Sequence, residues 1–283
     1  MDGPTESALF SSDDAAGWIA VPRDDDDKYS RGVVGFVTGS AKYPGAAVLG
    51  VEAAARTGVG MIRYLGAGRP TRLVLQRRPE AVTADGQVQA WVLGSGQDPA
   101  NAQKSSLDEL TAEYLDNALA QAVPTVLDGG ALGRRADAHG LVLLTPHARE
   151  LSRLIDLDVD AILADPDAAA QRAAHELDAT VLLKGHTTRI ASPAGGEPLR
   201  VRSAPSWLAT AGAGDALAGI LGALLATHHE RLEADPGALA QLAATGVVLH
   251  GLAAQSASAG GPLTILDLAA ALPGVIAELL RIP

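Results

Sequence analysis

Residues 209–226 read ATAGAGDALAGILGALLA, in which a glycine-rich loop ends at Asp215 and runs directly into an apolar, alanine-rich helix. Glycines ahead of a helix let the backbone approach a ligand closely, and the free N–H groups at the helix start bind an anion. The segment therefore predicts a phosphate cradle. Asp215 at its mouth is placed to accept a proton from a hydroxyl group that attacks the phosphate. The structural alternative for this aspartate is a simple helix N-cap.

The sequence around this segment alternates short β-branched runs with alanine-rich stretches, which is the pattern of a parallel sheet with crossover helices. The run 33–38 predicts a buried strand, and the helix after it begins near Pro44 and stops at Gly58. Further strands are expected at 61–65, 91–93, 125–127, 141–144 and 180–183. Runs at 187–191 and 199–203 flank a turn-rich SPAGGEP and predict an antiparallel hairpin at the sheet edge. Helices are expected at 46–56, 215–229, 237–256, 266–271 and 274–281.

Composition indicates one large α/β domain at 28–283 after an acidic N-terminal extension at 1–27. The chain is 47% hydrophobic but only 3% aromatic, so Ala, Val and Leu must form the core. A net charge of −11 argues against nucleic acid as a partner, and the absence of cysteine excludes disulfides, thiolate metal sites and cysteine nucleophiles. The N-terminus lacks the pattern of a secretory signal, and the longest apolar run, 216–227, is expected to be a buried helix. We therefore expect a cytoplasmic protein that does not bind membranes.

Polar residues follow several of the expected strands, and the carboxyl ends of parallel strands meet at one crevice. His147 begins a helix in the segment TPHARE, with Glu150 in the first turn of that helix. Asp128 ends the VLD strand, where it could reach Mg²⁺ through water. A cation, a flexible glycine and two hydroxyl groups follow the 180–183 strand and suit a nucleotide phosphate or ribose: Lys184, Gly185, His186, Thr187 and Thr188. The alternatives are a structural histidine, a strand-end cap and a lysine in a turn.

Glycine loops after the first and third strands, Gly39-Ser40 and Gly94-Ser95-Gly96, complete this ring of strand-end residues. They do not form a dinucleotide-binding fingerprint, and the chain contains no Walker A loop. No residue is predicted to be a direct metal ligand.

Together these residues resemble the NAD(P)H-hydrate dehydratases, a family of the ribokinase-like superfamily that repairs hydrated nicotinamide cofactors at the expense of ADP or ATP. The resemblance covers residues 28–280. Its motifs occur in the family's order: KYSRGVVGFVTGS, YPGAAVLGVEAAARTGVG, VLGSG, VLDGGAL, LTPHARE, VLLKGHTT, LATAGAGDALAGILGALL and VVLHGLAA. It implies a three-layer α/β/α sandwich with a mostly parallel central sheet and an antiparallel edge.

The resemblance also implies roles for individual residues. Asp215 falls on the family's catalytic aspartate, with Gly212 and Gly214 beside the nucleotide phosphate, and residues 184–188 fall on the segment that holds the nucleotide. The contacts with the hydrated dinucleotide fall on Ala46, Gly96 and His147, with Asp215 at the reacting hydroxyl. ADP is the implied nucleotide, ATP the other possibility, with Mg²⁺ as the accompanying ion. The implied products are NAD(P)H, AMP and phosphate, and the implied assembly is a homotetramer.

The chain departs from the family's pattern at three places. Gly130 stands where a second acidic residue is usual, Ala148 and Arg149 replace Pro-Gly, and Ala213 lies in a GAGD that is closer to the motif of sugar and vitamin kinases. A small-molecule kinase of the same superfamily is therefore the alternative activity, and a catalytically silent nucleotide-binding regulator is the third possibility. The 27 residues before the resemblance are too few for an epimerase domain, so we expect the dehydratase alone.

Overall fold

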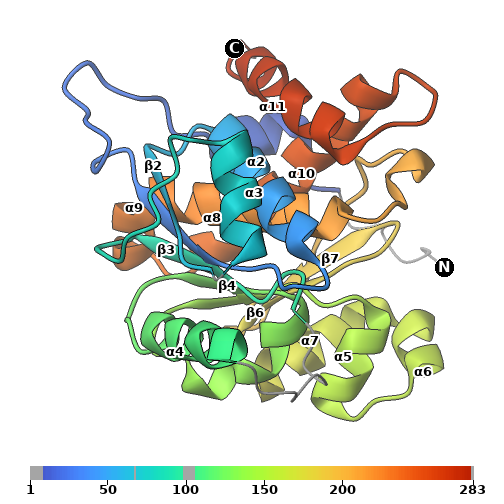
Figure 1. The fold of residues 1–283 in the computed structure, drawn as a ribbon. Helices are drawn as coiled ribbons and strands as arrows, with labels where there is room; N and C mark the ends of the chain where they lie inside the picture. Colours follow the sequence, from blue (N-terminus) through green and yellow to red (C-terminus); the bar gives the residue numbers. More distant parts are fainter. Residues whose placement is uncertain (1–8, 67, 98–105, 282–283) are drawn as a thin grey trace, which may run out of the picture.

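An eight-stranded sheet forms the centre of the computed structural model, which describes residues 9–66, 68–97 and 106–281 (Figure 1). The strand order is β2-β1-β3-β4-β5-β6-β7-β8. Strands β1 to β6 pair in parallel, whereas β7 is antiparallel to both β6 and β8. The strands are β1 (Val33–Val37), β2 (Met61–Tyr64), β3 (Ala90–Leu93), β4 (Thr125–Leu127), β5 (Val142–Leu144), β6 (Thr180–Leu183), β7 (Thr188–Ala191) and β8 (Leu199–Val201).

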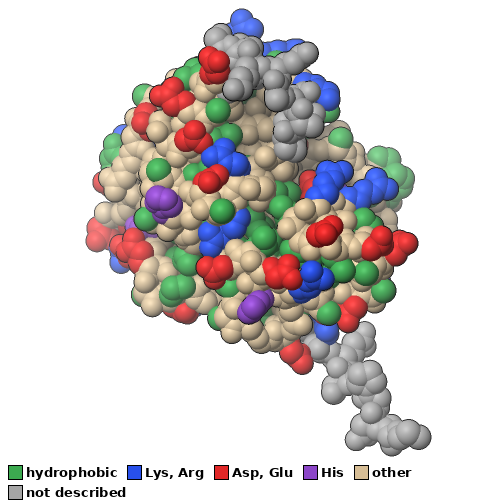
Figure 2. Space-filling model, turned by 90° about the horizontal axis from the view of Figure 1, so that it is seen from below, with side chains coloured by type: hydrophobic (Ala, Val, Ile, Leu, Met, Phe, Trp, Pro, Cys, Tyr) green, Lys and Arg blue, Asp and Glu red, His purple; other side chains and the backbone are tan. Residues whose placement is uncertain are grey.

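Helices cover both faces of the sheet and make a three-layer sandwich (Figure 1). The upper layer contains α1 (Ser12–Ala16), α2 (Pro44–Thr57), α3 (Arg69–Arg77), α8 (Ala213–Thr227), α10 (Ala238–Ser258) and α11 (Ile265–Leu279). The lower layer contains α4 (Ser106–Leu119), α5 (Ala148–Ile155), α6 (Val159–Ala164) and α7 (Pro166–Glu176). The remaining elements are the 3₁₀ helices η1 (Gly129–Asp137) and η2 (Ser206–Leu208) and the helix α9 (His229–Ala234). On the face of the molecule seen from below, acidic and basic side chains are interspersed (Figure 2).

Side chains alternate across each strand and so divide the core into two clusters. Val34 and Phe36 of β1 pack with the upper helices, whereas Val33 and Val37 of the same strand pack with the lower ones. Both faces of the sheet are therefore buried, as is usual for parallel sheets.

Helices α2 and α8 cross at two glycines, and this contact fixes the start of α8. A Cβ at Gly219 would lie 2.1 Å from the carbonyl oxygen of Gly50. A Cβ at Gly50 would lie 3.3 Å from the carbonyl oxygen of Asp215. Only glycine allows the two backbones to approach so closely. The first turn of α8 is therefore held directly against α2, the helix that follows β1.

The expected strands and the antiparallel edge are confirmed, and the helix predictions need two corrections. The segments 266–271 and 274–281 form one helix, α11, with Pro273 inside it, because buried residues such as Leu268 and Leu272 continue its apolar face. The longest apolar helix is α10 rather than 216–227. Within the described residues α10 alone is long and apolar enough to cross a membrane, but 83% of that window is buried in the core.

Part of the acidic N-terminal segment packs on the upper layer. Ala15 of α1 is fully buried, and α1 contacts α10 and α11. The backbone N–H of Phe10 donates a hydrogen bond of 2.8 Å to the carbonyl of Arg200 in β8. The chain before β1 is thus joined to the outer strand of the sheet.

Candidate active site

The carboxyl ends of β3 to β6 and the start of α8 bring the predicted site residues together. Residues 147 and 184 pair as an isolated parallel bridge, with the Lys184 N–H donating 2.8 Å to the Pro146 carbonyl. A Cβ on Gly214 would lie 3.7 Å from the Lys184 Nζ, so the lysine ammonium faces the first turn of α8. The loops expected to meet at one edge of the sheet therefore do meet there.

Lys184 lies among carboxylates. Its Nζ is 2.9 Å from Asp128 Oδ1 and 3.8 Å from Glu150 Oε2. Burial lowers the pKa of Lys184, but the charges of Asp128, Glu150 and Asp215 outweigh burial and raise that pKa above its ordinary value. The lysine is therefore a permanent cation whose charge is already largely compensated.

Asp128 is buried and binds this lysine directly. Its Oδ1 accepts hydrogen bonds from Lys184 and, at 2.8 Å, from the Thr145 hydroxyl, and its Oδ2 accepts one of 2.9 Å from the Ser95 hydroxyl. Both carboxylate oxygens thus have partners from the loops after β3, β5 and β6. Among the described residues, no group of three or more His, Asp or Glu side chains gathers as a metal site.

Asp215 belongs to the first turn of α8, whose N-cap is Gly212. The simple N-cap interpretation of Asp215 is therefore wrong. Burial, and after it the nearby charge of Asp128, raises the pKa of Asp215 to about 6, although the charge of Lys184 opposes the shift. The side chain keeps partial access to solvent. A carboxylate with a pKa near the working pH suits a general base.

Gly212 enables the sharp entry into α8. Its φ is +92°, and a Cβ there would lie 2.5 Å from Leu49 Cδ1. Both the left-handed backbone and the lack of space demand glycine. The N–H of Ala213 donates 3.4 Å to the Thr210 carbonyl, so the loop presents the N–H groups of Gly214 and Asp215 at the start of α8, beside Lys184.

His147 is held by a reciprocal capping box at the start of α5. Its Nδ1 accepts a hydrogen bond of 3.2 Å from the Glu150 N–H, and its own N–H donates 2.8 Å to Glu150 Oε2. Because Nδ1 is an acceptor, the neutral ring carries its proton on Nε2. The side chain is 51% exposed, and its Nε2 lies 3.6 Å from Glu150 Oε2.

Ala46 and Gly96 touch at the other side of the site. A Cβ on Gly96 would lie 2.3 Å from the Cβ of Ala46, and Gly96 has a φ of +67°. Ala46 and Gly96 are 50 positions apart in the sequence and nevertheless pack directly against each other.

The loop after β6 is only partly open to solvent. Gly185 and His186 are exposed, whereas Thr188 is buried with its hydroxyl 3.4 Å from the Gly185 carbonyl oxygen. The His186 Nε2 accepts a hydrogen bond of 3.1 Å from Arg202 Nε. Thr188 thus braces the loop from inside, and Arg202 joins the site from β8.

Sequence reasoning missed three partners of these residues. Ser95 and Thr145 were noticed only as parts of loops, and Arg202 was not singled out at all. A hydroxyl that follows a buried strand is the only local signal for Ser95 and Thr145, because their common partner Asp128 is distant in sequence.

The three departures from the family's sequence pattern, at Gly130, at Ala148-Arg149 and at Ala213, lie at different places in the structure. A Cβ on Gly130 would come within 2.8 Å of the Gln97 carbonyl oxygen, so the local backbone has no room for a side chain there. Arg149 is exposed in the first turn of α5, and Ala213 is the first residue of α8.

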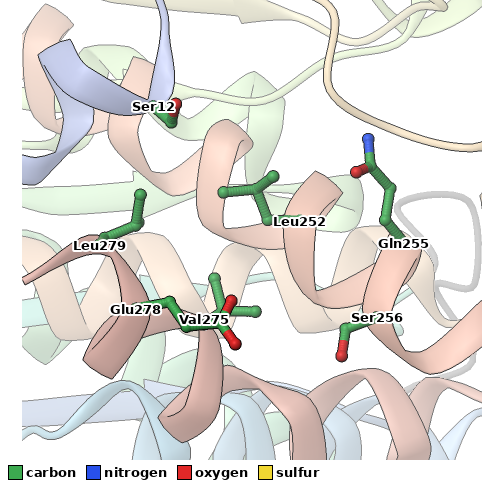
Figure 3. A pocket seen from close by; sticks show the side chains of 7 residues that line it. All are labelled: Ser12, Leu252, Gln255, Ser256, Val275, Glu278 and Leu279. Carbon is green, nitrogen blue, oxygen red and sulfur yellow. The ribbon is translucent and has the colours of Figure 1, made fainter. Parts of the chain in front are cut away.

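A pocket of about 430 Å³ lies apart from this site, between α1, α10 and α11 (Figure 3). It is lined by Ser12, Leu252, Gln255, Ser256, Val275, Glu278 and Leu279. None of these residues takes part in the cluster at the strand ends, and we assign no chemistry to this pocket.

Comparison with known proteins identifies the family. The sequence model of the NAD(P)H-hydrate dehydratase family matches residues 34–271. The chain belongs to the NAD(P)H-hydrate dehydratase family. It is 41% identical over 236 residues to the bifunctional NAD(P)H-hydrate repair enzyme Nnr of Mycobacterium tuberculosis, with 79% of this chain and 47% of that protein covered. It is 36% identical to the ADP-dependent (S)-NAD(P)H-hydrate dehydratase of Neisseria meningitidis, with 82% and 79% covered.

The ribokinase-like fold expected of this dehydratase family is confirmed. A ribokinase-like superfamily protein from Enterococcus faecalis superposes with a TM-score of 0.80 at 25% identity, covering 96% of this chain and 95% of that one. The chain spans about half the length of the Mycobacterium relative, at 47%.

Proposed function

We propose that this chain is an ADP-dependent (S)-NAD(P)H-hydrate dehydratase that repairs hydrated NADH or NADPH and converts ADP to AMP and phosphate. The observation that carries the proposal is Asp215, a carboxylate whose pKa is raised to about 6, in the helix turn that also presents free N–H groups and faces the Lys184 ammonium. The family to which the chain belongs and the name of the Neisseria relative support it.

In the proposed reaction, Asp215 accepts the proton of the ring hydroxyl of the hydrate, and the hydroxyl oxygen attacks the terminal phosphorus of ADP. The bond between that phosphorus and its bridging oxygen breaks, and AMP leaves. The C–O bond of the phosphorylated ring then breaks with loss of a neighbouring ring proton, which expels phosphate and restores the dihydronicotinamide double bond. Free N–H groups at the start of α8 stabilise the charge on the transferring phosphoryl group.

We assign nucleotide binding to Lys184, Gly185, His186, Thr187, Gly212 and Gly214, with Thr188 as the brace of the loop. We assign contacts with the hydrate to Ala46, Gly96 and His147. The exposed Nε2–H of His147 suits a phosphate or ribose oxygen of the dinucleotide.

Mg²⁺ would enter with the nucleotide. It usually keeps several waters and binds through phosphate oxygens plus one or two carboxylates. The fit to Asp128 is poor because both of its oxygens already accept hydrogen bonds. When bound, the ion would neutralise phosphate charge, and the described residues hold it through the nucleotide rather than directly.

The test mixes the purified protein with hydrated NADH, ADP and Mg²⁺ and follows the return of dihydronicotinamide absorbance. Recovery with ADP, and none in the Asp215→Asn variant, is expected. No recovery with either ADP or ATP would overturn the proposal.

A small-molecule kinase is the second candidate, favoured by Ala213 in the GAGD sequence. The two activities differ in their products, because the dehydratase releases inorganic phosphate whereas a kinase retains it on the acceptor. Phosphate release that depends on the hydrate therefore separates them. We further propose a cytoplasmic homotetramer, which light scattering would test against a predicted mass of four chains.

A further inference from the structure

In the part of the chain that the structure describes, the site has no uncompensated lysine charge with which to bind the phosphates of a nucleotide. Lys184 is compensated by Asp128 at 2.9 Å and Glu150 at 3.8 Å, and Asp215 adds a third carboxylate nearby. A nucleoside diphosphate brings further negative charge to this cluster. The helix start contributes only partial positive charge. Besides the Mg²⁺ that would enter with the nucleotide, a protein cation close to the loop 184–188 would therefore strengthen the binding of the phosphates.

The topology brings Arg202 to the same edge as Lys184. Strand β8 is antiparallel to β7, and β7 is antiparallel to β6, so β8 and β6 run in the same direction. Lys184 is the first residue after β6, and Arg202 is the first residue after β8. Both side chains therefore leave the sheet at its carboxyl edge.

The guanidinium of Arg202 is exposed and is oriented by one contact. Its Nε donates 3.1 Å to the Nε2 of His186, inside the proposed nucleotide loop. Within residues 9–66, 68–97 and 106–281 it has no carboxylate partner, whereas Arg200 of the same strand lies 2.9 Å from Asp167. The bond to His186 occupies one of five N–H donors and leaves the two Nη groups to face a ligand.

The residues next to Arg202 connect it to the phosphate cradle. A Cβ on Gly251 would lie 2.1 Å from the Ser203 Oγ, and that hydroxyl donates 3.2 Å to the Val247 carbonyl of α10. The neighbour of Gly251, His250, is buried and hydrogen bonds to the backbone of Ala213 at the start of α8. Ser203, the residue after Arg202, thus packs on the same segment of α10 that hydrogen bonds to the start of α8.

We propose that Arg202, oriented by His186, binds the phosphates of the nucleoside diphosphate together with Lys184. This inference rests on the nucleotide-binding part of the proposed function. A planar guanidinium with both Nη groups available binds phosphate oxygens in a bidentate manner, which a lysine cannot reproduce.

The experiment measures ADP binding by titration calorimetry in the presence of Mg²⁺ and in the absence of any hydrate. The variants are Arg202→Met, Arg202→Lys and the control Arg231→Met. Arg231 lies on α9 beyond the far end of α8, where its guanidinium packs on the Trp18 ring, so the control removes the same charge away from the site. Each melting temperature is measured first, to confirm folding.

Arg202→Met is expected to weaken ADP binding about 10- to 100-fold, the range for a lost charged hydrogen bond. Arg202→Lys recovers part of the affinity, and Arg231→Met remains within about twofold of the wild type. Adenosine, which has no phosphate, binds all four proteins equally. His186→Ala weakens ADP binding in the wild type but adds little to Arg202→Met, because the two residues act as a unit.

The inference is wrong if a folded Arg202→Met binds ADP as tightly as the control does, if adenosine affinity falls by the same factor as ADP affinity, or if the wild type does not bind ADP. Arg202-dependent ADP binding without hydrate repair would refute the proposed dehydratase activity alone. Hydrate repair with an unchanged KM for ADP in Arg202→Met would refute the role of Arg202 alone.

Discussion

Asp215→Asn is expected to abolish activity and at the same time to stabilise the folded protein at neutral pH. Folding raises the pKa of this carboxyl from 3.8 to about 6, chiefly because burial disfavours the charged form. A shift of about 2 units corresponds to about 3 kcal/mol, at roughly 1.4 kcal/mol a unit. Asparagine has the same shape and no charge, so it avoids this cost. The value is an upper bound because the side chain keeps some contact with solvent.

The gain in unfolding free energy from Asp215→Asn is expected to increase with pH. Since the folded state binds the proton more tightly than the unfolded chain, this proton contributes stability that is fully present below pH 3.8 and lost as the pH rises through about 6. Wild type and Asp215→Asn are therefore expected to have similar unfolding free energies near pH 4. Above pH 7 the variant is more stable by up to about 3 kcal/mol, or several degrees in Tm.

Urea unfolding at pH 4, 5, 6, 7 and 8 measures this difference, alongside hydrate repair at the same pH values. The activity of the wild type should fall as the pH drops below about 6, because the base becomes protonated. A difference in stability that stays constant across this range would refute the raised pKa, and full repair activity in Asp215→Asn would refute its role as the base.

Three further predictions concern the framework of the site. Glu52→Gln should lower the unfolding free energy by up to about 3 kcal/mol at pH 7, because this fully buried carboxylate binds three arginines that are partly exposed. Urea unfolding measures this change, and a loss below about 0.5 kcal/mol would contradict the reasoning. Gly219→Ala should cost about 1–3 kcal/mol and reduce activity by displacing α8, with Gly50→Ala the milder change because its Cβ meets its nearest atom at 3.3 Å rather than 2.1 Å; equal losses in unfolding free energy would count against this account. Burial lowers the pKa of His250 to about 4, so the folded state resists its protonation and stability is lost as the pH falls from 6.5 toward 4. This loss should be smaller in His250→Asn by up to about 3 kcal/mol. Parallel profiles of unfolding free energy against pH in the wild type and the variant would disprove it.

The fold was largely predictable because its signals are local. Each strand run of β-branched and apolar residues ends at Gly, Asp, Pro or Lys, and the SPAGGEP turn identified the antiparallel hairpin. The expected division of α11 into 266–271 and 274–281 is wrong for the same reason. Pro273 indicates a break when read locally, whereas the packing of Leu268 and Leu272 in the core keeps the helix continuous.

The convergence of the site loops at one edge of the sheet was predicted from the sequence, but the contacts between their side chains were not. Proximity to a strand end identified Asp128, His147 and Lys184, because parallel strands deliver their carboxyl ends to one edge, whereas the glycine-rich loop before an apolar helix identified Asp215. The charge pairing within the site could not be predicted, because Lys184 and its partner Asp128 are 56 residues apart and the spacing has no periodicity.

The sequence by itself determined the parallel sheet with its antiparallel edge, the glycine-rich entry to α8 and the acid at its mouth, since each depends on the conformational preferences of neighbouring residues. Only the tertiary structure decided that Asp215 has a raised pKa and that the charge of Lys184 is largely compensated by carboxylates. It also decided that Arg202 reaches the nucleotide loop. Electrostatic effects depend on burial and on distances between residues that are remote in sequence, and both are set only when the layers pack.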